Sequence, residues 1–294
     1  MSRRSQPRRD LRGARELVAA LRGTRTKRVS AMVRVRNEQE FLAAAVHSIA
    51  SFVDEVVIVD NVSTDRTPEV IRALARELPA VRQLGYRYQV ARVGRENLDA
   101  VREGDSPSRR RLSRYYNWAL RQCRYPYILK WDGDMVAGHE FGSAWEEWHS
   151  GPYLSMRFRG LNAHPDRIHQ LAARNRDPAV VGRGLAGDIV PAWTLQMTHT
   201  ADETRLFPRF LARYDDGLWW CERLSSPFAS GPLAGRYGLE LMAPLYLHLK
   251  YWKQSPHANQ SPDFAAMIQR NVAVGPPLSD AWRQILAEHG LPGS

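Results

Sequence analysis

Short apolar runs alternate with segments of helical periodicity along the first half of the chain. Residues 29–35 have the composition of a strand, and residues 55–59 are so uniformly apolar that a strand buried on both faces is expected. Apolar side chains recur at helical spacing over residues 40–52 and again over residues 68–78. Strands that alternate with helices predict an α/β fold with a largely parallel sheet and helices on both of its faces.

The pattern is less regular beyond residue 80. Residues 83–89 form a weaker candidate strand, and residues 99–113, which contain glycine, proline and three consecutive arginines, favour a loop. A helix is predicted for residues 115–123. It is followed by a strand over residues 127–131, which ends at Asp132.

Three predicted strands each run into a cluster of charged or amide side chains. These clusters are Arg36-Asn37-Glu38, Asp60-Asn61 and Asp132-Gly133-Asp134. Ligands of such sheets bind outside the carboxyl ends of the strands, so we expect the three clusters to meet at one edge. Two aspartates held close by a glycine suit Mg²⁺ or Mn²⁺ carrying a phosphate-bearing ligand. Asp-Gly-Asp is also an ordinary turn sequence, and the other two clusters are what favours a site.

The positive charge is concentrated near the N-terminal end. The formal net charge is +11, and ten Lys and Arg against two acidic residues place +8 of it in the first 28 residues. The other 266 residues carry only +3, so the charge does not indicate a nucleic-acid-binding body. Leu11, Ala14, Val18 and Leu21 fall near one helical face of this segment. The segment is therefore expected either to contact an anionic membrane or to be a solvated tail.

Membrane and redox signals favour a cytoplasmic protein. No apolar stretch approaches the roughly 18 residues that a membrane span needs, and the first residues lack an apolar signal core. Cys123 and Cys221 lie far apart without a Cys-x-x-Cys spacing. A reduced, cytoplasmic protein is expected, at the inner face of the membrane if the basic segment binds lipid.

Four stretches, in this order, resemble bacterial family-2 glycosyltransferases of the GT-A fold. The first two are residues 33–38, with a terminal Asn-Glu, and residues 57–67, with an Asp-x-x-Ser-x-Asp-x-Thr pattern. The third is residues 114–120 leading to Trp131-Asp132-Gly133-Asp134, which resembles the metal-binding Asp-x-Asp. The fourth is residues 203–209 followed by residues 220–224. It is a partial match because Cys221 stands where the family usually has histidine.

The resemblance covers about residues 29–250 and implies a domain organisation. A basic tail is expected over residues 1–28, a GT-A domain over 29–255 and a helical extension over 256–294. The GT-A domain would divide into a nucleotide-binding half, residues 29–135, and an acceptor half, residues 136–255. The extension contains a predicted helix over residues 279–289, which Gly290 ends.

The resemblance also implies a nucleotide pocket that favours uridine. Asp60 is placed to accept a base N–H, and the alternative is that it caps the following turn. Arg36, Asn37 or Glu38 would border the nucleoside. Arg114 would reach a phosphate, or would be an exposed residue at the start of a helix without a role.

A sugar that leaves a nucleoside diphosphate puts negative charge on the phosphate. Mg²⁺ or Mn²⁺ held by Asp134 would neutralise this charge, with Asp132 contacting the ribose or the metal. Late histidines are a third metal ligand in some GT-A enzymes, and His248 is the candidate for this position. A lone histidine in an apolar segment is more often a core residue, so this alternative stays open.

An inverting transfer needs a carboxylate that removes the proton of the acceptor hydroxyl. Glu222 is the first candidate because neighbouring tryptophans would raise its pKa, and Asp188 is the second. The alternative for Glu222 is an ion pair with Arg205, Arg209 or Arg223.

The sequence thus predicts an inverting, metal-dependent glycosyltransferase. The expected donor is a UDP-sugar, and the acceptor is a glycan, a lipid-linked molecule or a small molecule. A sugar-phosphate nucleotidyltransferase is an alternative, but residues 34–38 lack the glycine-rich phosphate loop that it would need. A non-enzymatic binder of membrane or nucleic acid is a second alternative. No zinc spacing or nucleic-acid-binding signature supports specific nucleic-acid recognition.

Overall fold

The computed structural model describes most of the chain from residue 27 onward. The described residues are 27–102, 108–163, 167–171, 203–216, 223–229, 232–253, 259–263, 265–266 and 272–291, with Arg15, Val18 and Ala19. The helices are α2 (Leu42–Ala50), α3 (Thr67–Glu77), α4 (Arg95–Arg102), α5 (Leu112–Gln122), α6 (Glu140–Ser150), α8 (Pro232–Tyr237), α10 (Asp280–Glu288) and the 3₁₀ helix η4 (Lys250–Trp252). The strands are β1 (Val29–Val35), β2 (Glu55–Asp60), β3 (Val81–Gly85), β4 (Tyr127–Asp132), β5 (Met135–Ala137), β6 (Ser155–Asn162), β7 (Arg167–Leu171), β8 (Glu203–Pro208), β9 (Arg213–Asp215), β10 (Arg223–Ser225), β11 (Gly238–His248) and β12 (Val272–Pro277).

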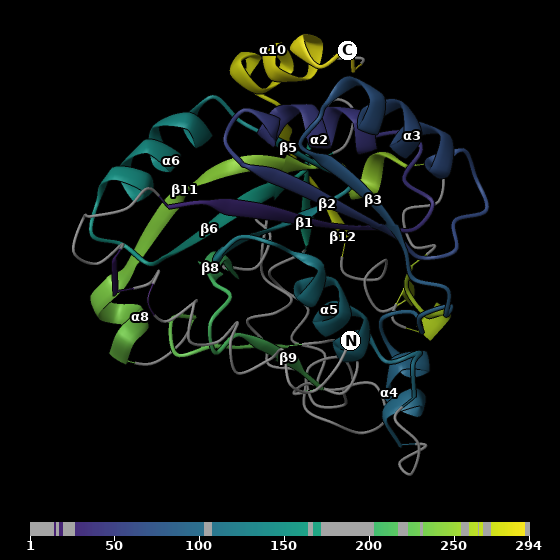
Figure 1. Cartoon of the computed structure of the whole chain (residues 1–294). Coiled ribbons are helices and arrows are strands. Elements are labelled where there is room, and N and C mark those ends of the chain that lie inside the picture. The colour runs from purple at the N-terminus through teal and green to yellow at the C-terminus, as the bar shows by residue number, and fades with distance from the viewer. Residues whose placement is uncertain are drawn as a thin grey trace, which may run out of the picture.

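A large mixed sheet forms the centre of the described part of the chain, and β9 with β10 and β7 with β12 form two small antiparallel sheets (Figure 1). The eight strands of the large sheet lie in the order β3-β2-β1-β4-β8-β6-β11-β5. β3, β2, β1 and β4 are parallel to one another, and β8 is antiparallel to both β4 and β6. Since β11 is parallel to β6, it runs in the same direction as β1 and β4. The carboxyl ends of β1, β2, β4 and β11 therefore lie at the same edge of the sheet.

Helices cover both faces of the sheet, as the sequence predicts. α2, α3 and α6 lie on one face and α5 on the other, which Figure 1 shows from the side. Alternate residues of one strand enter different apolar clusters. Val33 of β1 packs in the cluster with α2, α3 and α6, whereas Met32 packs in the cluster with α5. Each fully buried side chain of this size contributes about 1.5–3 kcal/mol to folding, so the uniformly apolar strands stabilise both layers. The predicted α/β class with a mostly parallel sheet is confirmed.

The predicted loop over residues 99–113 is wrong at both ends. α4 extends to Arg102, and α5 already begins at Leu112. Arg111, one of the arginines that favoured a loop, donates hydrogen bonds of 3.0 Å to the carbonyls of Ala100 and Val101. It thus satisfies carbonyl groups at the end of α4. The composition of this segment does not predict such a contact.

The third strand and the C-terminal helix also differ slightly from expectation. β3 occupies Val81–Gly85 because its register pairs Val81 with Val56 and Gly85 with Asp60 of β2, earlier than the predicted residues 83–89. α10 follows the prediction closely, and Gly290 after it has a φ of 68°, which favours glycine. Ile285 and Leu286 of α10 pack in a third apolar cluster with Phe41 and Val136.

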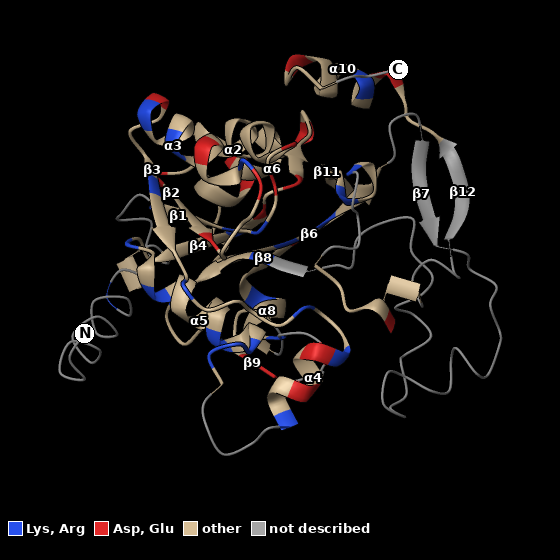
Figure 2. Ribbon diagram, turned by 90° about the vertical axis from the view of Figure 1, so that its right-hand side faces the viewer, with Lys and Arg blue, Asp and Glu red and all other residues tan. Residues whose placement is uncertain are grey.

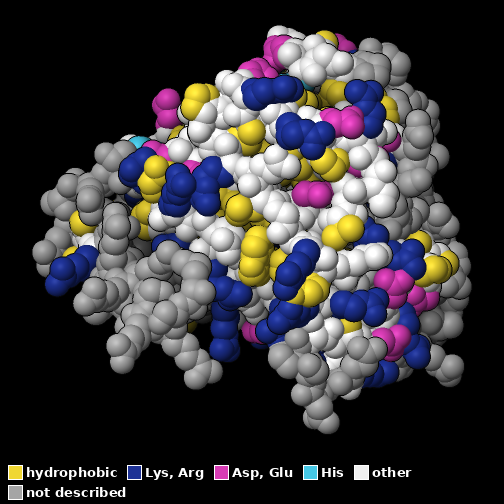
Figure 3. Space-filling model, turned by 45° about the vertical axis from the view of Figure 1, so that its right-hand side comes forward, with side chains coloured by type: hydrophobic (Ala, Val, Ile, Leu, Met, Phe, Trp, Pro, Cys, Tyr) yellow, Lys and Arg dark blue, Asp and Glu magenta, His cyan; other side chains and the backbone are white. Residues whose placement is uncertain are grey.

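Charged residues of both signs are distributed over the described helices and strands (Figure 2). On the face shown in Figure 3, Lys and Arg side chains outnumber those of Asp and Glu. In the described part of the chain, no helix is both long enough and apolar enough to cross a membrane.

Lys27 anchors the start of the sheet to the end of α6. Its ammonium donates to the carbonyls of Trp148 and Gly151 and lies 4.7 Å from the centre of the Trp148 ring. Burial lowers the pKa of Lys27 to about 8. We expect Lys27→Met to lower the free energy of unfolding by about 1–3 kcal/mol, since two carbonyls at a helix end lose a charged donor. Urea unfolding measures this.

Arg66→Met is the matched control for Lys27→Met. Arg66 forms an ion pair with Glu69 in which both side chains are more than half exposed. This substitution should change the free energy of unfolding by less than about 1 kcal/mol. Equal effects of the two substitutions would contradict an anchoring role of Lys27.

Candidate functional site

The three polar clusters predicted at strand ends do lie at one edge of the sheet. Val35 pairs with Asp60 and Arg34 with Asp132 across the parallel strands. Asn37 follows β1 with a φ of 56°, a conformation that asparagine tolerates better than most residues. Its amide N–H donates to Ser63 Oγ at 2.9 Å, and its side-chain oxygen accepts from Thr64 N at 2.8 Å. Asn37 thus connects the loops that follow β1 and β2.

Asp60 is engaged within its own turn. Its Oδ1 accepts hydrogen bonds from the hydroxyl of Ser63 at 2.5 Å and from the Ser63 N–H at 3.3 Å. The neighbouring Asn61, which lines the cavity described below, accepts from Val90 N and donates to the carbonyls of Tyr86 and Tyr88. The alternative role of Asp60 as a turn cap is therefore visible, whereas its contact with a nucleobase stays a prediction.

Two buried arginines hold Asp132. Arg34 Nη2 lies 2.9 Å from Asp132 Oδ1, and Arg205 Nη1 of β8 lies 3.3 Å from Oδ2. The arginine side chains are only 4% and 5% exposed. The Arg34 guanidinium also stacks on the ring of Tyr116 at 3.4 Å. Burial raises the pKa of the Asp132 carboxyl, but the charges of Lys130, Arg205 and Arg34 outweigh it and lower the pKa to about 2.

Asp134 lies beside His248, the last residue of β11, and beside Lys253, which follows η4. His248 Nε2 is 3.3 Å from Asp134 Oδ1, and Lys253 Nζ is 2.5 Å from Oδ2. The backbone carbonyl of Asp134 also accepts from Leu249 N at 2.7 Å, which fixes the two segments together. Burial opposes ionisation of Asp134, but the charges of Lys253 and His248 outweigh it and hold its pKa well below the usual range.

Glu38 is a third carboxyl side chain at this strand edge, beside Asp132 and Asp134. Its carboxylate oxygens lie 2.7 Å from Lys253 Nζ, and its side chain is only 7% exposed. Burial, together with the charge of Asp134, raises the pKa of Glu38 to about 8 against the opposing effect of Lys253. Three carboxyl groups thus lie at one strand edge: Glu38 and Asp134 share Lys253, whereas Asp132 is held by two arginines.

Gly133 allows this close approach. A Cβ atom at this position would lie 2.8 Å from Val35 Cγ1 and 3.1 Å from Glu38 Cγ. Any side chain here would push the loop after β4 away from the end of β1. The glycine between the two aspartates is thus required by packing as well as by the turn.

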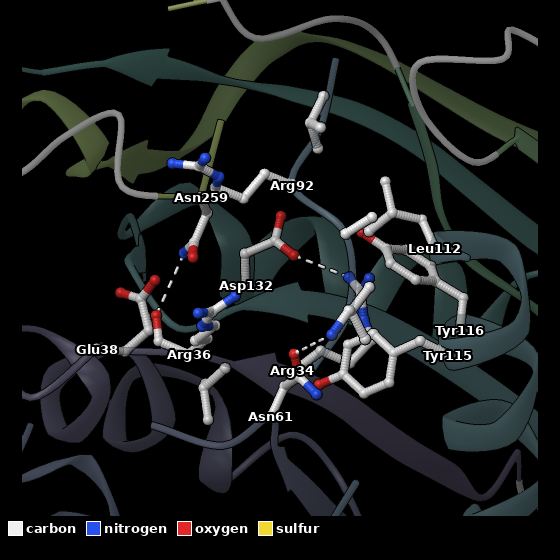
Figure 4. A pocket seen from close by; sticks show the side chains of 14 residues that line it. Arg34, Arg36, Glu38, Asn61, Arg92, Leu112, Tyr115, Tyr116, Asp132 and Asn259 are labelled. Carbon is white, nitrogen blue, oxygen red and sulfur yellow. Dashed lines mark hydrogen bonds and ion pairs between the residues drawn. The ribbon is translucent and has the colours of Figure 1, made fainter. Parts of the chain in front are cut away.

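A cavity of about 150 Å³ opens beside these residues (Figure 4). Arg34, Arg36, Glu38 and Asp132 line it, with Tyr115 and Tyr116 from α5 on one side. Opposite, the chain returns at Asn259, whose Nδ2 donates to the carbonyl of Arg36 at 3.2 Å. The cavity thus lies at the carboxyl ends of the parallel strands, between charged and aromatic walls.

Residues 30–153 match the sequence model of Glycosyl transferase family 2. This part of the chain is therefore similar to glycosyl transferase family 2. Two curated relatives from Rickettsia typhi and Rickettsia prowazekii, each named an uncharacterized glycosyltransferase, are 35% identical over 60 residues. These alignments span 20% of this chain and 20% of each relative.

Several solved glycosyltransferase structures are distantly similar. Glucosyl-3-phosphoglycerate synthase from Mycobacterium tuberculosis, solved with Mn²⁺, UDP and phosphoglyceric acid, has 16% identity and a TM-score of 0.40, with coverage of 95% of this chain and 83% of that chain. The mannosyltransferase PcManGT from Pyrobaculum calidifontis, solved with GDP-Man and Mn²⁺, has 20% identity and a TM-score of 0.32. That similarity covers 52% of this chain and 47% of the mannosyltransferase.

Asp134 and His248 at this strand edge are candidate ligands of a divalent cation. Among the described ranges, no group of three His, Cys, Asp and Glu side chains is arranged to hold a metal ion. Asp134 and His248 nevertheless present a carboxylate oxygen and an imidazole nitrogen side by side, and Mg²⁺ needs only one or two protein ligands besides phosphates. A cationic group, Lys253, already lies on Asp134. The donors present therefore fit Mg²⁺ or Mn²⁺ bound through Asp134 and His248.

Several predicted residues lie away from this group or outside the described residues. Glu222 and Asp188, the two candidates for the general base, fall outside the described ranges. Arg114 is in the first turn of α5, partly buried, and is not among the described residues that line the cavity. Their roles stay predictions.

Lys253 and Asn259 are site residues that sequence reasoning missed. Both follow β11 and reach the strand edge because the chain folds back there. Lys253 was recognisable only as a basic residue five positions after His248. Arg205 was noted only as an ion-pair partner for Glu222, whereas it contacts Asp132.

Proposed function

We propose that this chain is a glycosyltransferase that takes a sugar from a nucleoside diphosphate donor bound at the carboxyl edge of β1, β2 and β4. The observation that carries the proposal is the meeting of Glu38, Asp132 and Asp134 with buried cations beside a cavity, and these three carboxylates lie in the region that is similar to glycosyl transferase family 2. The donor diphosphate is anionic, and the cations Arg34, Arg205 and Lys253 favour it electrostatically.

Arg34 has a hydrogen-bond donor that a ligand in the cavity would satisfy. Its Nε is buried and finds no hydrogen-bond partner among the described residues, although the side chain lines the cavity. A buried guanidinium N–H without a partner is costly, and a phosphate or ribose oxygen would satisfy it. Asp132 and the Tyr116 ring fix the orientation of this arginine before the donor binds.

Asp134 and His248 would hold Mg²⁺ or Mn²⁺ in this proposal. The cation would supply positive charge next to the leaving diphosphate. Asp132, which two arginines already engage, would contact the ribose and keep Arg34 in place. Glu38 and Asn37 would border the nucleoside, together with Arg36 and Asn259.

The residues that would act on the acceptor are proposed from the sequence. Glu222 would remove the acceptor proton, with Asp188 as the alternative, and inversion is the outcome that this role implies. A UDP-sugar donor, a glycan, lipid-linked or small-molecule acceptor, and contact of the basic N-terminal segment with an anionic membrane are the finer expectations.

Calorimetric titration tests the donor site. We expect one of UDP, GDP and dTDP to bind with Mn²⁺ at least about tenfold more tightly than the other two, and binding to weaken by about tenfold or more in EDTA. The corresponding nucleoside monophosphate is the matched ligand control and should bind more weakly, because it lacks the second phosphate that the cations contact. If no nucleotide binds in either condition, the proposed function is wrong.

A further inference from the structure

Lys253 lies between two carboxyl groups of the site, those of Glu38 and Asp134. Its Nζ lies 2.5 Å from Asp134 Oδ2 and 2.7 Å from each carboxylate oxygen of Glu38. The three side chains are 12%, 7% and 7% exposed, so water screens these contacts little. One ammonium is thus shared by two buried carboxylates that would otherwise repel each other.

The contact with Asp134 coincides with the place where a metal would bind. His248 lies on one oxygen of Asp134 and Lys253 on the other. A divalent cation bound to this carboxylate would lie next to the ammonium, and like charges a few ångströms apart in a buried site repel strongly. Both cations cannot remain close to Asp134 at the same time.

We propose that Lys253 is an internal cation that competes with the divalent metal for Asp134 and turns to the donor diphosphate when the metal binds. The lysine stem is flexible and its ammonium is a compact point charge, so the ammonium can leave Asp134 while the backbone stays in place. Glu38 remains a partner during this movement. The inference rests on the proposed function for its second half only, because competition with the metal does not require a nucleotide.

This arrangement has a functional consequence. In the absence of ligands, the Lys253 ammonium reduces the repulsion between the carboxyl groups of Glu38 and Asp134. The metal alone gains little by displacing the ammonium, whereas a metal that arrives with a diphosphate offers Lys253 a new anionic partner. Metal and donor are therefore expected to bind cooperatively.

The test is the affinity for Mn²⁺ alone, measured by electron paramagnetic resonance without nucleotide. We expect Lys253→Met to bind Mn²⁺ at least about tenfold more tightly than the wild type. Lys253→Arg keeps the positive charge and should stay within about threefold of the wild type. Arg66→Met is the control for the loss of a positive charge: Arg66 is exposed and forms its ion pair with Glu69, and its loss should change Mn²⁺ affinity by less than about threefold.

The second measurement is the affinity for the nucleoside diphosphate in the absence of metal. In EDTA, Lys253→Met should bind the preferred nucleoside diphosphate about tenfold more weakly than the wild type, because no metal replaces the lost ammonium. Circular dichroism checks that the variants fold. If the methionine variant is unfolded, Lys253→Gln, which keeps a hydrogen-bond donor for Glu38, replaces it in the same titrations.

An unchanged or weaker Mn²⁺ affinity of Lys253→Met would overturn the inference, as would an Mn²⁺ affinity of Lys253→Arg as high as that of the methionine variant. These outcomes are separate from failure of the proposed function. If the wild type binds no nucleotide but Lys253→Met still gains affinity for Mn²⁺, only the glycosyltransferase proposal falls.

Discussion

Replacement of Asp134 by asparagine is expected to reduce release of the nucleoside diphosphate from the sugar donor by about 10³-fold. The carboxylate is the anionic member of the Asp134–His248 pair, and a bound cation contributes several kcal/mol of charge stabilisation, at about 1.4 kcal/mol for each tenfold in rate. Asparagine retains the size of the side chain, so Gly133 and the turn stay in place. The rate of nucleoside diphosphate release in the presence of Mn²⁺ measures the effect, with the nucleotide identified by calorimetry.

Asp280→Asn is the matched control for Asp134→Asn. Asp280 is exposed in the first turn of α10, and its substitution should leave the rate of release unchanged. An Asp134→Asn protein that retains most of the activity would show that this aspartate does not hold the catalytic cation.

Asp132→Ala is expected to lower the free energy of unfolding by about 3–5 kcal/mol. Arg34 and Arg205 would both remain buried without the carboxylate between them, and removing one partner of a buried ion pair leaves uncompensated charge. Chemical denaturation measures this loss. The exposed pair of Arg66 and Glu69 is the reference, where Glu69→Ala should cost less than about 1 kcal/mol.

A double substitution measures the interaction between Asp132 and Arg205. Asp132→Ala combined with Arg205→Met removes one of the two arginines that lose this carboxylate, so the double variant should be more stable than the sum of the two single effects predicts. Strict additivity would indicate that Arg205 and Asp132 do not interact in solution.

The strand edge of the site could be predicted from local sequence patterns. Uniformly apolar runs indicate parallel strands, and polar residues directly after them have to lie at a common edge. Arg36, Asp60 and Asp132 were placed correctly at that edge for this reason. The end of α4 was not, because the arginines after it suggested a loop whereas Arg111 binds carbonyls of the helix.

The residues that close the site could not be predicted in this way. Lys253 contacts Glu38 across 215 positions of sequence, and Asn259 contacts Arg36 across 223. No periodicity connects such pairs, since their contact depends on the register of β11 and on the path of the chain after it. His248 was selected by resemblance, and its neighbour Asn162, 3.0 Å from Nδ1, had no sequence signal at all.

The route of the chain after β11 bears on how relatives of this protein should be compared. Most residues that line the cavity lie within residues 30–153, which match the family model, but His248, Lys253 and Asn259 belong to a segment outside that match. Divergence in the later segment can alter which cations meet the donor while the cavity residues within 30–153 stay the same. Two proteins that are alike over the first segment alone can therefore differ in metal requirement. Orthologues are better grouped by the residues aligned with Lys253 and His248 than by overall identity.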